Sequence, residues 1–338
     1  MVRNSSKIGR LLRARRLKIF FRVHGVADLY AANGLVTALG ISKRDVVIEK
    51  VGHEISSGKI RECLPGFSIA KKIRLTRDLL PITFDTEGPM RLGSDDNPIF
   101  TYDPFKYFLF KRSFHRKQRR LKSSLGLLKG RKIISVSCTG ADEARCVIEA
   151  FKKLEAKPRP LLVLALRKPE GFRIRIPGIR THRRKSAGEF LPKLGAFDMA
   201  VLGTMGEFLD WVAVSDLAVI GHDRNIFEPA FCGVPVLYFK RPLKMNPQEE
   251  SLAASFNLFW RKNRTALWLL NHCGAAKPIR PGSLDLQMNE ILRNPASMIR
   301  GSRRAVRRLY IEVLPKARAK AASILARSLD LKKPFESL

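Results

Sequence analysis

The sequence predicts an α/β protein whose C-terminal half forms a parallel sheet with helices on both faces. Apolar stretches of strand length, such as KIISVSC, PLLVLALR and DLAVI, alternate there with helix-like stretches. The length of 338 residues, with 45% hydrophobic residues, is enough for about two domains with cores of their own. No run of eighteen apolar residues occurs, so no transmembrane helix is predicted.

The N-terminal part begins with a pattern typical of one βαβ unit. KIFFRV at residues 18–23 predicts a strand, ADLYAANGLVTALG at 27–40 a helix and DVVIEKV at 45–51 a second strand. LLPITFD at 79–85 predicts a further strand. The following EGPMRLGSDDNP, residues 87–98, has the Gly, Pro, Asn and Asp content of a loop.

From residue 131 onward the alternation is regular. The strand KIISVSC, the helix ADEARCVIEAFKKLEAK and the strand PLLVLALR come first. The strand FDMAVLG, the helix MGEFLDWVAVSD and the strand DLAVIG follow, and a short helix closed by Gly233 leads to the strand VPVLYF. Because ligands of parallel sheets bind outside the carboxyl ends of the strands, the residues just after each strand are the candidates for a binding site.

A basic stretch separates the two parts. KRSFHRKQRRLKSSLGLLKG, residues 111–130, predicts a helical connector. We therefore divide the chain into a basic N-terminal segment (1–17), a short N-terminal domain (18–120), a C-terminal Rossmann-like domain (121–310) and a basic C-terminal helix (311–338).

The charge balance restricts the partners. The chain has 64 Lys and Arg against 30 Asp and Glu, a net charge of +34. Such a chain attracts polyanions, so nucleic acid, an anionic membrane surface and a phosphorylated substrate are the partners to consider. The five cysteines are widely spaced and form no CxxC pair, so we expect neither a disulfide framework nor a zinc site, and a reducing compartment.

Both ends of the chain are basic. The first 24 residues carry eight Lys or Arg and no acid. They fit an amphipathic segment on anionic lipid, with Ile8, Leu11, Leu12 and Leu17 toward the bilayer, or an organellar transit peptide, or a solvated tail.

The C-terminal end predicts a long basic helix, from Pro295 to about Leu329. We interpret it as amphipathic, with solvated cations and five side chains packed inward: Ala305, Val306, Leu309, Ile311 and Val313. No RNA-binding signature accompanies it, and membrane steering is a further role for its cations.

Two polar stretches follow predicted strands. GTMGE at residues 203–207 opens a helix, where free N–H groups and glycines suit a nucleotide phosphate, although small residues also begin helices for packing reasons. Asn225 and Glu228 are three residues apart and share a helical face. Glu228 there can accept two hydrogen bonds from a ribose diol. The alternative is a capping box, with Asn225 as N-cap and Glu228 as its third helical residue.

Six segments in order resemble the C-terminal domain of the Kdo (3-deoxy-D-manno-octulosonic acid) transferases. They are CTGADEARCVIEA, LLVLALRKPEG, HRRKSAGEF, VLGTMGEFLDWVAVSDLAVIG, NIFEPAFCGVPVLYF and MNPQEE, and they cover about half of the chain. The resemblance implies a GT-B fold, in which two Rossmann-like domains face each other across a cleft. The N-terminal domain of this chain would be short and divergent.

The resemblance also implies a reaction and its residues. An acceptor hydroxyl on a lipid A-type molecule would attack the anomeric carbon of CMP-Kdo and release CMP, at the cytoplasmic face of the inner membrane. Residues 121–310 would bind the donor and residues 18–120 the acceptor. No metal and no cofactor are expected. The implied donor-binding residues are Thr139, Arg167, Thr204, Met205, Gly206, Glu207, Asn225, Glu228, Asn246 and Glu249. The candidates for the general base are Glu54, Asp85 and Glu87.

The sequence also departs from the family. Lys168 stands where the family has histidine, Gly203 directly precedes Thr204 without the family's intervening aspartate, and HDR at residues 222–224 replaces Gly-Gly-His. The N-terminal half shows none of the family's pattern. Two alternatives therefore stay open: a non-catalytic or repurposed GT-B relative that binds anionic lipid or RNA, and a GT-B enzyme that uses a UDP-sugar.

Overall fold

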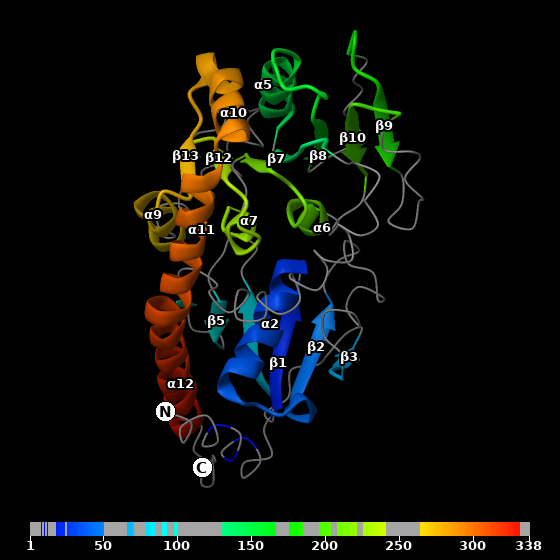
Figure 1. The fold of residues 1–338 in the computed structure, drawn as a ribbon. Helices are drawn as coiled ribbons and strands as arrows, with labels where there is room; N and C mark the ends of the chain where they lie inside the picture. Colours follow the sequence, from blue (N-terminus) through cyan, green and yellow to red (C-terminus); the bar gives the residue numbers. More distant parts are fainter. Residues whose placement is uncertain are drawn as a thin grey trace, which may run out of the picture. The chain divides into compact units, whose positions relative to one another are not determined.

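The chain folds into two compact units (Figure 1). The computed structural model describes Ile8, Arg10, Leu12 and residues 18–23, 26–50, 66–70, 79–84, 90–92, 98–100, 130–138, 140–166, 176–184, 196–203, 208–221, 226–240 and 264–331. Unit 1 comprises Met1–Lys111 and Leu309–Leu338, and unit 2 comprises Arg112–Arg308.

Unit 1 contains a six-stranded sheet in the order β3-β2-β1-β4-β5-β6. Its strands are β1 (Lys18–Val23), β2 (Val46–Lys50), β3 (Ser68–Ala70), β4 (Leu79–Phe84), β5 (Met90–Leu92) and β6 (Pro98–Phe100), with the helix α2 (Val26–Leu39) and the short 3-10 helix η1 (Lys43–Asp45) between β1 and β2. β1 pairs in parallel with β2 on one side and β4 on the other. The predicted βαβ unit and the predicted strand after it are thus confirmed.

The predicted loop at residues 87–98 is wrong in part. β5 and β6 lie at its two ends, and they extend the sheet as antiparallel strands beyond β4. Pro98 is the first residue of β6, a position where the missing N–H of proline removes little of the ladder. Met90 and Leu92 alternate around Arg91, a two-residue period too short to outweigh the turn-forming residues around it.

The core of unit 1 includes part of the N-terminal segment. Ile8 and Leu12 are 2% and 0% exposed and pack with α2, β1 and β2. The expectation that both side chains face a bilayer is therefore wrong: spaced four residues apart, they cover the protein's own core instead. Leu11 and Leu17 lie outside the described residues.

Unit 2 contains a seven-stranded sheet, parallel throughout, in the order β13-β12-β11-β7-β8-β10-β9. The strands are β7 (Ile133–Cys138), β8 (Leu161–Leu166), β9 (Thr181–Arg184), β10 (Met199–Leu202), β11 (Leu217–Ile220), β12 (Val236–Tyr238) and β13 (Ala276–Pro278). The helices are α5 (Ala141–Lys152), α6 (Phe208–Val212), α7 (Glu228–Phe231), α9 (Arg264–His272), η5 (Pro281–Ser283), α10 (Leu284–Arg293) and α11 (Ala296–Arg308). The predicted alternation of strands and helices is confirmed.

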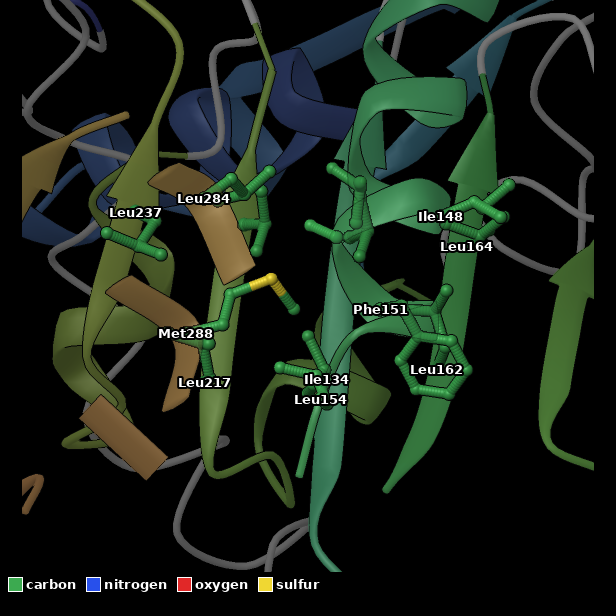
Figure 2. Packing of buried hydrophobic residues seen from close by; sticks show 14 of the residues in the cluster. Ile134, Ile148, Phe151, Leu154, Leu162, Leu164, Leu217, Leu237, Leu284 and Met288 are labelled. Atoms are coloured by element: carbon green, nitrogen blue, oxygen red, sulfur yellow. The ribbon is translucent and has the colours of Figure 1, made fainter. Parts of the chain in front are cut away.

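Both faces of this sheet are buried, because alternate strand residues point to opposite sides. Ile134 and Val136 belong to a cluster that α5 and α10 cover through residues such as Phe151 and Met288 (Figure 2). Ile133 points to the other face, in a cluster that includes Trp211 of α6. The strands are therefore fixed in place, and their ends provide rigid positions for a site.

The predicted C-terminal helix is interrupted by a π-helix. α11 is followed by η6 (Leu309–Val313), a π-helix, and then by α12 (Leu314–Leu331). Ala305 and Leu309 are buried as predicted, whereas Ile311 is 61% exposed, which contradicts its predicted inward position. After Leu309 the next buried residue is Leu314, five positions on, because a π-turn inserts one extra residue and rotates the buried face. Val306 and Val313 are half-buried.

No helix among the described residues is both long and apolar enough to cross a bilayer.

Helix α11 packs unusually close to the turn after α9. A Cβ added at Gly301 would lie 2.5 Å from the carbonyl oxygen of Cys273 and 2.6 Å from backbone atoms of Gly274. Glycine is therefore the residue that lets the two backbones approach.

Replacing Gly301 with alanine should destabilise the protein by about 2 kcal/mol or more, because the backbone atoms that it meets cannot move aside as a side chain would. Alanine at an ordinary helix position would instead stabilise it. The measurement is chemical unfolding. Ser297→Ala, at an exposed position of the same helix, is the control and should change stability by less than about 0.5 kcal/mol.

The amino edge of the seven-stranded sheet is held by one arginine. Arg131, just before β7, donates hydrogen bonds to the carbonyl oxygens of Arg159 (2.8 Å), Pro160 (3.3 Å) and Phe197 (2.9 Å), and to the carboxylate of Asp198 (3.4 Å). These residues stand directly before β8 and β10. One side chain therefore connects the starts of three strands.

Asp198 completes this cluster. Its carboxylate also accepts hydrogen bonds from the side chain of Arg180 (3.1 and 3.2 Å) and from the backbone N–H of Arg180 (3.2 Å), just before β9. The hydrogen bonds and charge of Arg180, together with the charge of Arg131, lower the pKa of Asp198 below its ordinary value, against the opposing effect of burial. The fold therefore favours the ionised form.

Replacing Asp198 with asparagine should lower the free energy of unfolding by about 3 kcal/mol at pH 7, because it leaves the largely buried Arg131 without its counter-charge. Since the folded pKa is depressed, the carboxylate stabilises the protein above its ordinary pKa, and this contribution is lost as the pH falls through the folded pKa. The difference between wild type and variant should thus shrink in acid.

Denaturant unfolding at several pH values checks this. Asp142→Asn removes an exposed ion pair with Arg145 and is the matched control, with an expected cost below about 0.5 kcal/mol. A difference for Asp198→Asn that is the same at all pH values would contradict the assignment.

Candidate functional site

The winding of the seven-stranded sheet reverses at β7. The chain passes from β7 to β8 on one side, while β11 lies on the other side of β7. Connections that leave the carboxyl ends of β7 and β11 therefore run in opposite directions, and the crevice between them is the usual ligand site of such sheets. The backbone N–H of Gly221, directly after β11, donates to the carbonyl oxygen of Ser137 in β7 at 2.6 Å. This bond holds the carboxyl ends of the two strands together.

Helix α5 begins on the β7 side of the crevice. Its N-cap is Gly140, in an extended conformation (φ −122°, ψ 162°) and without a side-chain capping bond. A Cβ added at Gly140 would have no atom within 4 Å, so the space beside this backbone is open. The first N–H groups of a helix have no partner within the helix and attract anions. The arrangement thus suits a phosphate close to the backbone.

Glu228 lies on the β11 side, as the first residue of α7. Its side chain is 1% exposed, which makes it one of the most buried carboxylates among the described residues. The N-cap of α7 is Phe227, and no side-chain capping bond is present. Phe227 has helical φ and ψ (−92° and −21°), and Asn225 lies outside the described residues, so the capping box stays an alternative to ligand binding.

Gly233 closes the short helix α7, as predicted. It adopts a positive φ of 71°, and its N–H donates to the carbonyl oxygen of Ala230 at 3.0 Å. The N–H of Val234 donates to the carbonyl oxygen of Pro229 at 2.9 Å, and the two bonds form a Schellman motif. The position of Glu228 is thus fixed from both sides, by the end of β11 and by this turn.

The other predicted donor residues lie outside the described residues. They are Thr139, Arg167, Thr204, Met205, Gly206, Glu207, Asn225, Asn246 and Glu249. The elements that flank several of them are described: β7 ends at Cys138, β8 ends at Leu166, and β10 ends at Leu202 before the exposed Gly203. These three strand ends belong to the same edge of the sheet, as the sequence predicts.

The predicted base candidates Glu54, Asp85 and Glu87 also lie outside the described residues. Asp85 directly follows β4 in the chain. β4 and β2 lie on opposite sides of β1, so unit 1 has a winding reversal of its own.

Two residues at this edge were not among the predicted site residues. Arg184 is the last residue of β9 and is in register with Leu202, the last residue of β10, so its backbone lies at the carboxyl edge. In the sequence, Arg184 belongs to HRRKSAGEF, which is quoted above only as one of the segments that resemble Kdo transferases. Glu143, on the first turn of α5, is 2% exposed, and an acidic residue just after a helix start is its only sequence signal.

The thiol of Cys146 in α5 is not activated as a nucleophile. Burial raises the pKa of the Cys146 thiol, with a further contribution from the charge of Glu143, so the group stays a thiol at neutral pH. The part of the chain that the structure describes contains no cluster of three His, Cys, Asp or Glu side chains that could hold a metal ion.

Comparison with solved structures places the chain among GT-B folds. It superposes on Anabaena Alr3699/HepE, solved in complex with UDP and glucose, with a TM-score of 0.52 and 10% identity over 92% of this chain and 99% of that chain. WaaG, a glycosyltransferase involved in lipopolysaccharide biosynthesis, gives a TM-score of 0.46 and 12% identity over 91% and 99%. The C-terminal CMP-Kdo binding domain of WaaA from Acinetobacter baumannii gives 0.44 and 17% over 60% and 100%.

No family model matches the sequence, and no curated protein matches it significantly. At these low identities the structures show the fold alone. The predicted GT-B type α/β fold is confirmed, with two Rossmann-like units.

Proposed function

We propose that the chain is a glycosyltransferase that binds a nucleotide-activated sugar at the carboxyl edge of the seven-stranded sheet. One observation carries the proposal: the start of α5, where the space beside Gly140 is open, and the buried Glu228 lie on the two sides of the switch point between β7 and β11. A GT-B fold with these two groups can hold a nucleotide by both its phosphate and its ribose.

The two groups have complementary tasks. The N–H groups at the start of α5 hold the phosphate, since they point along the helix axis and Gly140 lets an anion come close. The Glu228 carboxylate accepts hydrogen bonds from the ribose diol. Cationic side chains and helix dipoles stabilise the leaving phosphate in the transition state.

The donor is CMP-Kdo, and the acceptor is an anionic lipid of the lipid A type at the cytoplasmic face of the inner membrane. The six segments that resemble Kdo transferases support this choice, as does the net charge of +34, which attracts a phosphorylated acceptor. Thr139, Arg167, residues 204–207, Asn225, Asn246 and Glu249 complete the donor site, and Glu54, Asp85 or Glu87 supplies the base.

A second candidate is a glycosyltransferase that uses a UDP-sugar. The observation that favours it is the superposition on HepE, which was solved in complex with UDP and glucose. Both candidates share the crevice and differ in the base of the nucleotide and in the number of its phosphates.

Thermal unfolding with CMP, UMP and UDP separates the candidates, because a ligand that binds the native state raises the melting temperature. Stabilisation by CMP alone supports the CMP-Kdo donor, and stabilisation by UDP alone supports the second candidate. Purified protein with CMP-Kdo and a lipid IVA-type acceptor should then release CMP. Folded protein that binds none of the nucleotides would refute a glycosyltransferase function.

Replacing Glu228 with glutamine should weaken binding of the stabilising nucleotide by about 100-fold, because it removes charge-assisted hydrogen bonds to the diol. Calorimetry measures the affinity. Glu49→Gln, a similarly buried glutamate in β2 of unit 1, is the control and should leave the affinity unchanged. Equal affinities for wild type and Glu228→Gln would show that Glu228 does not bind the nucleotide.

Replacing Gly140 with alanine separates binding from folding. The backbone of Gly140 is extended and its surroundings are open, so the fold accommodates a methyl group with a change below about 0.5 kcal/mol. A phosphate on the same backbone would be displaced, and we expect affinity to fall about tenfold or more. Gly282→Ala, equally open but in η5, is the control. Unchanged affinity in Gly140→Ala would place the phosphate elsewhere.

A further inference from the structure

Helices α9 and α11 of unit 2 lie side by side (Figure 1), and the exposed surface of α11 is basic. α11 carries five arginines, Arg300, Arg303, Arg304, Arg307 and Arg308, and neither helix contains an acidic residue. At about 100° per residue these five arginines fall within an arc of about 140°. The opposite arc, with Met298, Gly301, Ser302 and Ala305, is buried. The cations are therefore concentrated on one side of the helix.

An exposed tryptophan lies within this surface. Trp268 of α9 is 52% exposed, one of four large hydrophobic side chains that are exposed among the described residues. Its ring stacks on His272, with centroids 4.8 Å apart and planes inclined by 15°. The guanidinium of Arg308 lies 5.3 Å from the ring centroid. The indole is thus held in a fixed orientation by a cation and an imidazole, and half of its surface remains open to solvent.

We propose that this α9–α11 surface, defined by Trp268, His272 and the five arginines, docks onto an anionic lipid bilayer. Tryptophan is the side chain enriched at membrane interfaces, where an amphipathic ring lies at headgroup level. Arginines attract anionic headgroups, and each contributes a charge near the surface. The surface combines both properties, and its charge is complementary to lipid phosphates.

The geometry favours a bilayer over single-stranded RNA. Aromatic side chains bind RNA by stacking bases on a free ring face. In Trp268 the ring is already stacked on His272 and carries Arg308 over its face. A bilayer interface needs only the exposed part of the indole.

The inference deepens the proposed function, on whose membrane location it rests, by naming the surface that contacts the membrane. The surface lies outside the residues assigned to the nucleotide, and lipid binding there needs no nucleotide. It is also distinct from the N-terminal segment, where Ile8 and Leu12 are buried in the core of unit 1. The buried arc of α11 packs against α7, the helix that begins with Glu228, so lipid docking would position the donor site relative to the membrane.

The test uses full-length Arg303→Glu/Arg307→Glu. Both side chains are exposed, and each introduced carboxylate stands three residues after a remaining arginine, Arg300 or Arg304, so folding is preserved. Binding to vesicles of phosphatidylglycerol and phosphatidylcholine should weaken at least about 25-fold. The difference should narrow as salt is raised. Lys153→Glu/Lys157→Glu, an equal change of charge at exposed positions beyond α5, should change binding far less.

Tryptophan supplies a second, independent readout. Brominated lipids should quench the emission of the wild type strongly, and they should quench Trp268→Phe, which retains Trp211 and Trp260, much less. Leu286→Ala, at an exposed apolar position of α10, is the control and should retain quenching. Circular dichroism and the affinity for the stabilising nucleotide should be unchanged in all variants.

Four results would overturn the proposal: equal binding to phosphatidylcholine vesicles alone, unchanged vesicle binding in Arg303→Glu/Arg307→Glu, an equal loss in the Lys153/Lys157 variant, or quenching as strong in Trp268→Phe as in the wild type. A variant that loses generic RNA binding while vesicle binding persists would assign the surface to RNA instead. Protein that binds vesicles but no nucleotide would refute the proposed function and leave this surface assignment standing.

Discussion

The hydrogen bonds on both edges of β7 are the constraint on which unit 2 depends. β7 pairs with β8 over all six of its residues and with β11 over four. β7 lies between β8 and β11. The connection from the carboxyl end of β7 therefore leads to β8 on one side, and the connection from β11 leads to β12 on the other. The crevice is thus a consequence of strand order, whatever side chains occupy it.

The amino and carboxyl edges of the seven-stranded sheet have different roles. At the amino edge, Arg131 and Asp198 neutralise each other and satisfy the carbonyl groups that precede the strands. At the carboxyl edge, Gly140 begins its helix beside open space. The first edge thus stabilises the strand positions, and the second leaves room for a ligand at the start of α5.

The sequence was sufficient to predict five of the seven strands of unit 2, β7, β8, β10, β11 and β12, because buried parallel strands are continuous apolar runs between clear turn residues. It was insufficient for elements whose conformation depends on contacts with residues distant in the sequence. β9, with the sequence THRR, has no apolar period and is a strand only because it pairs with β10. Ile311 fits an α-helical apolar face, but the π-turn rotates that face away, and no periodicity reveals such a turn.

The site shows the same division. The sequence placed Glu228 after a strand and before Gly233, and both neighbours are where it predicted them. It could not decide between a cap and a ligand-binding residue, since both need the same residue types at the same spacing.

Electrostatic interactions in this protein act both at contact distance and over longer distances. Several carboxylates are used internally, with Glu143, Asp198 and Glu228 all buried at strand starts or helix starts. Carboxylates placed inside do not neutralise the surface, so arginines such as Arg303 and Arg307 face solvent without acidic neighbours on their helix. Their field attracts any polyanion within about 8–10 Å at physiological salt. Discrimination between polyanions must then come from short-range groups, the ring of Trp268 for a bilayer and the carboxylate of Glu228 for a nucleotide, because only contact distances distinguish one phosphate compound from another.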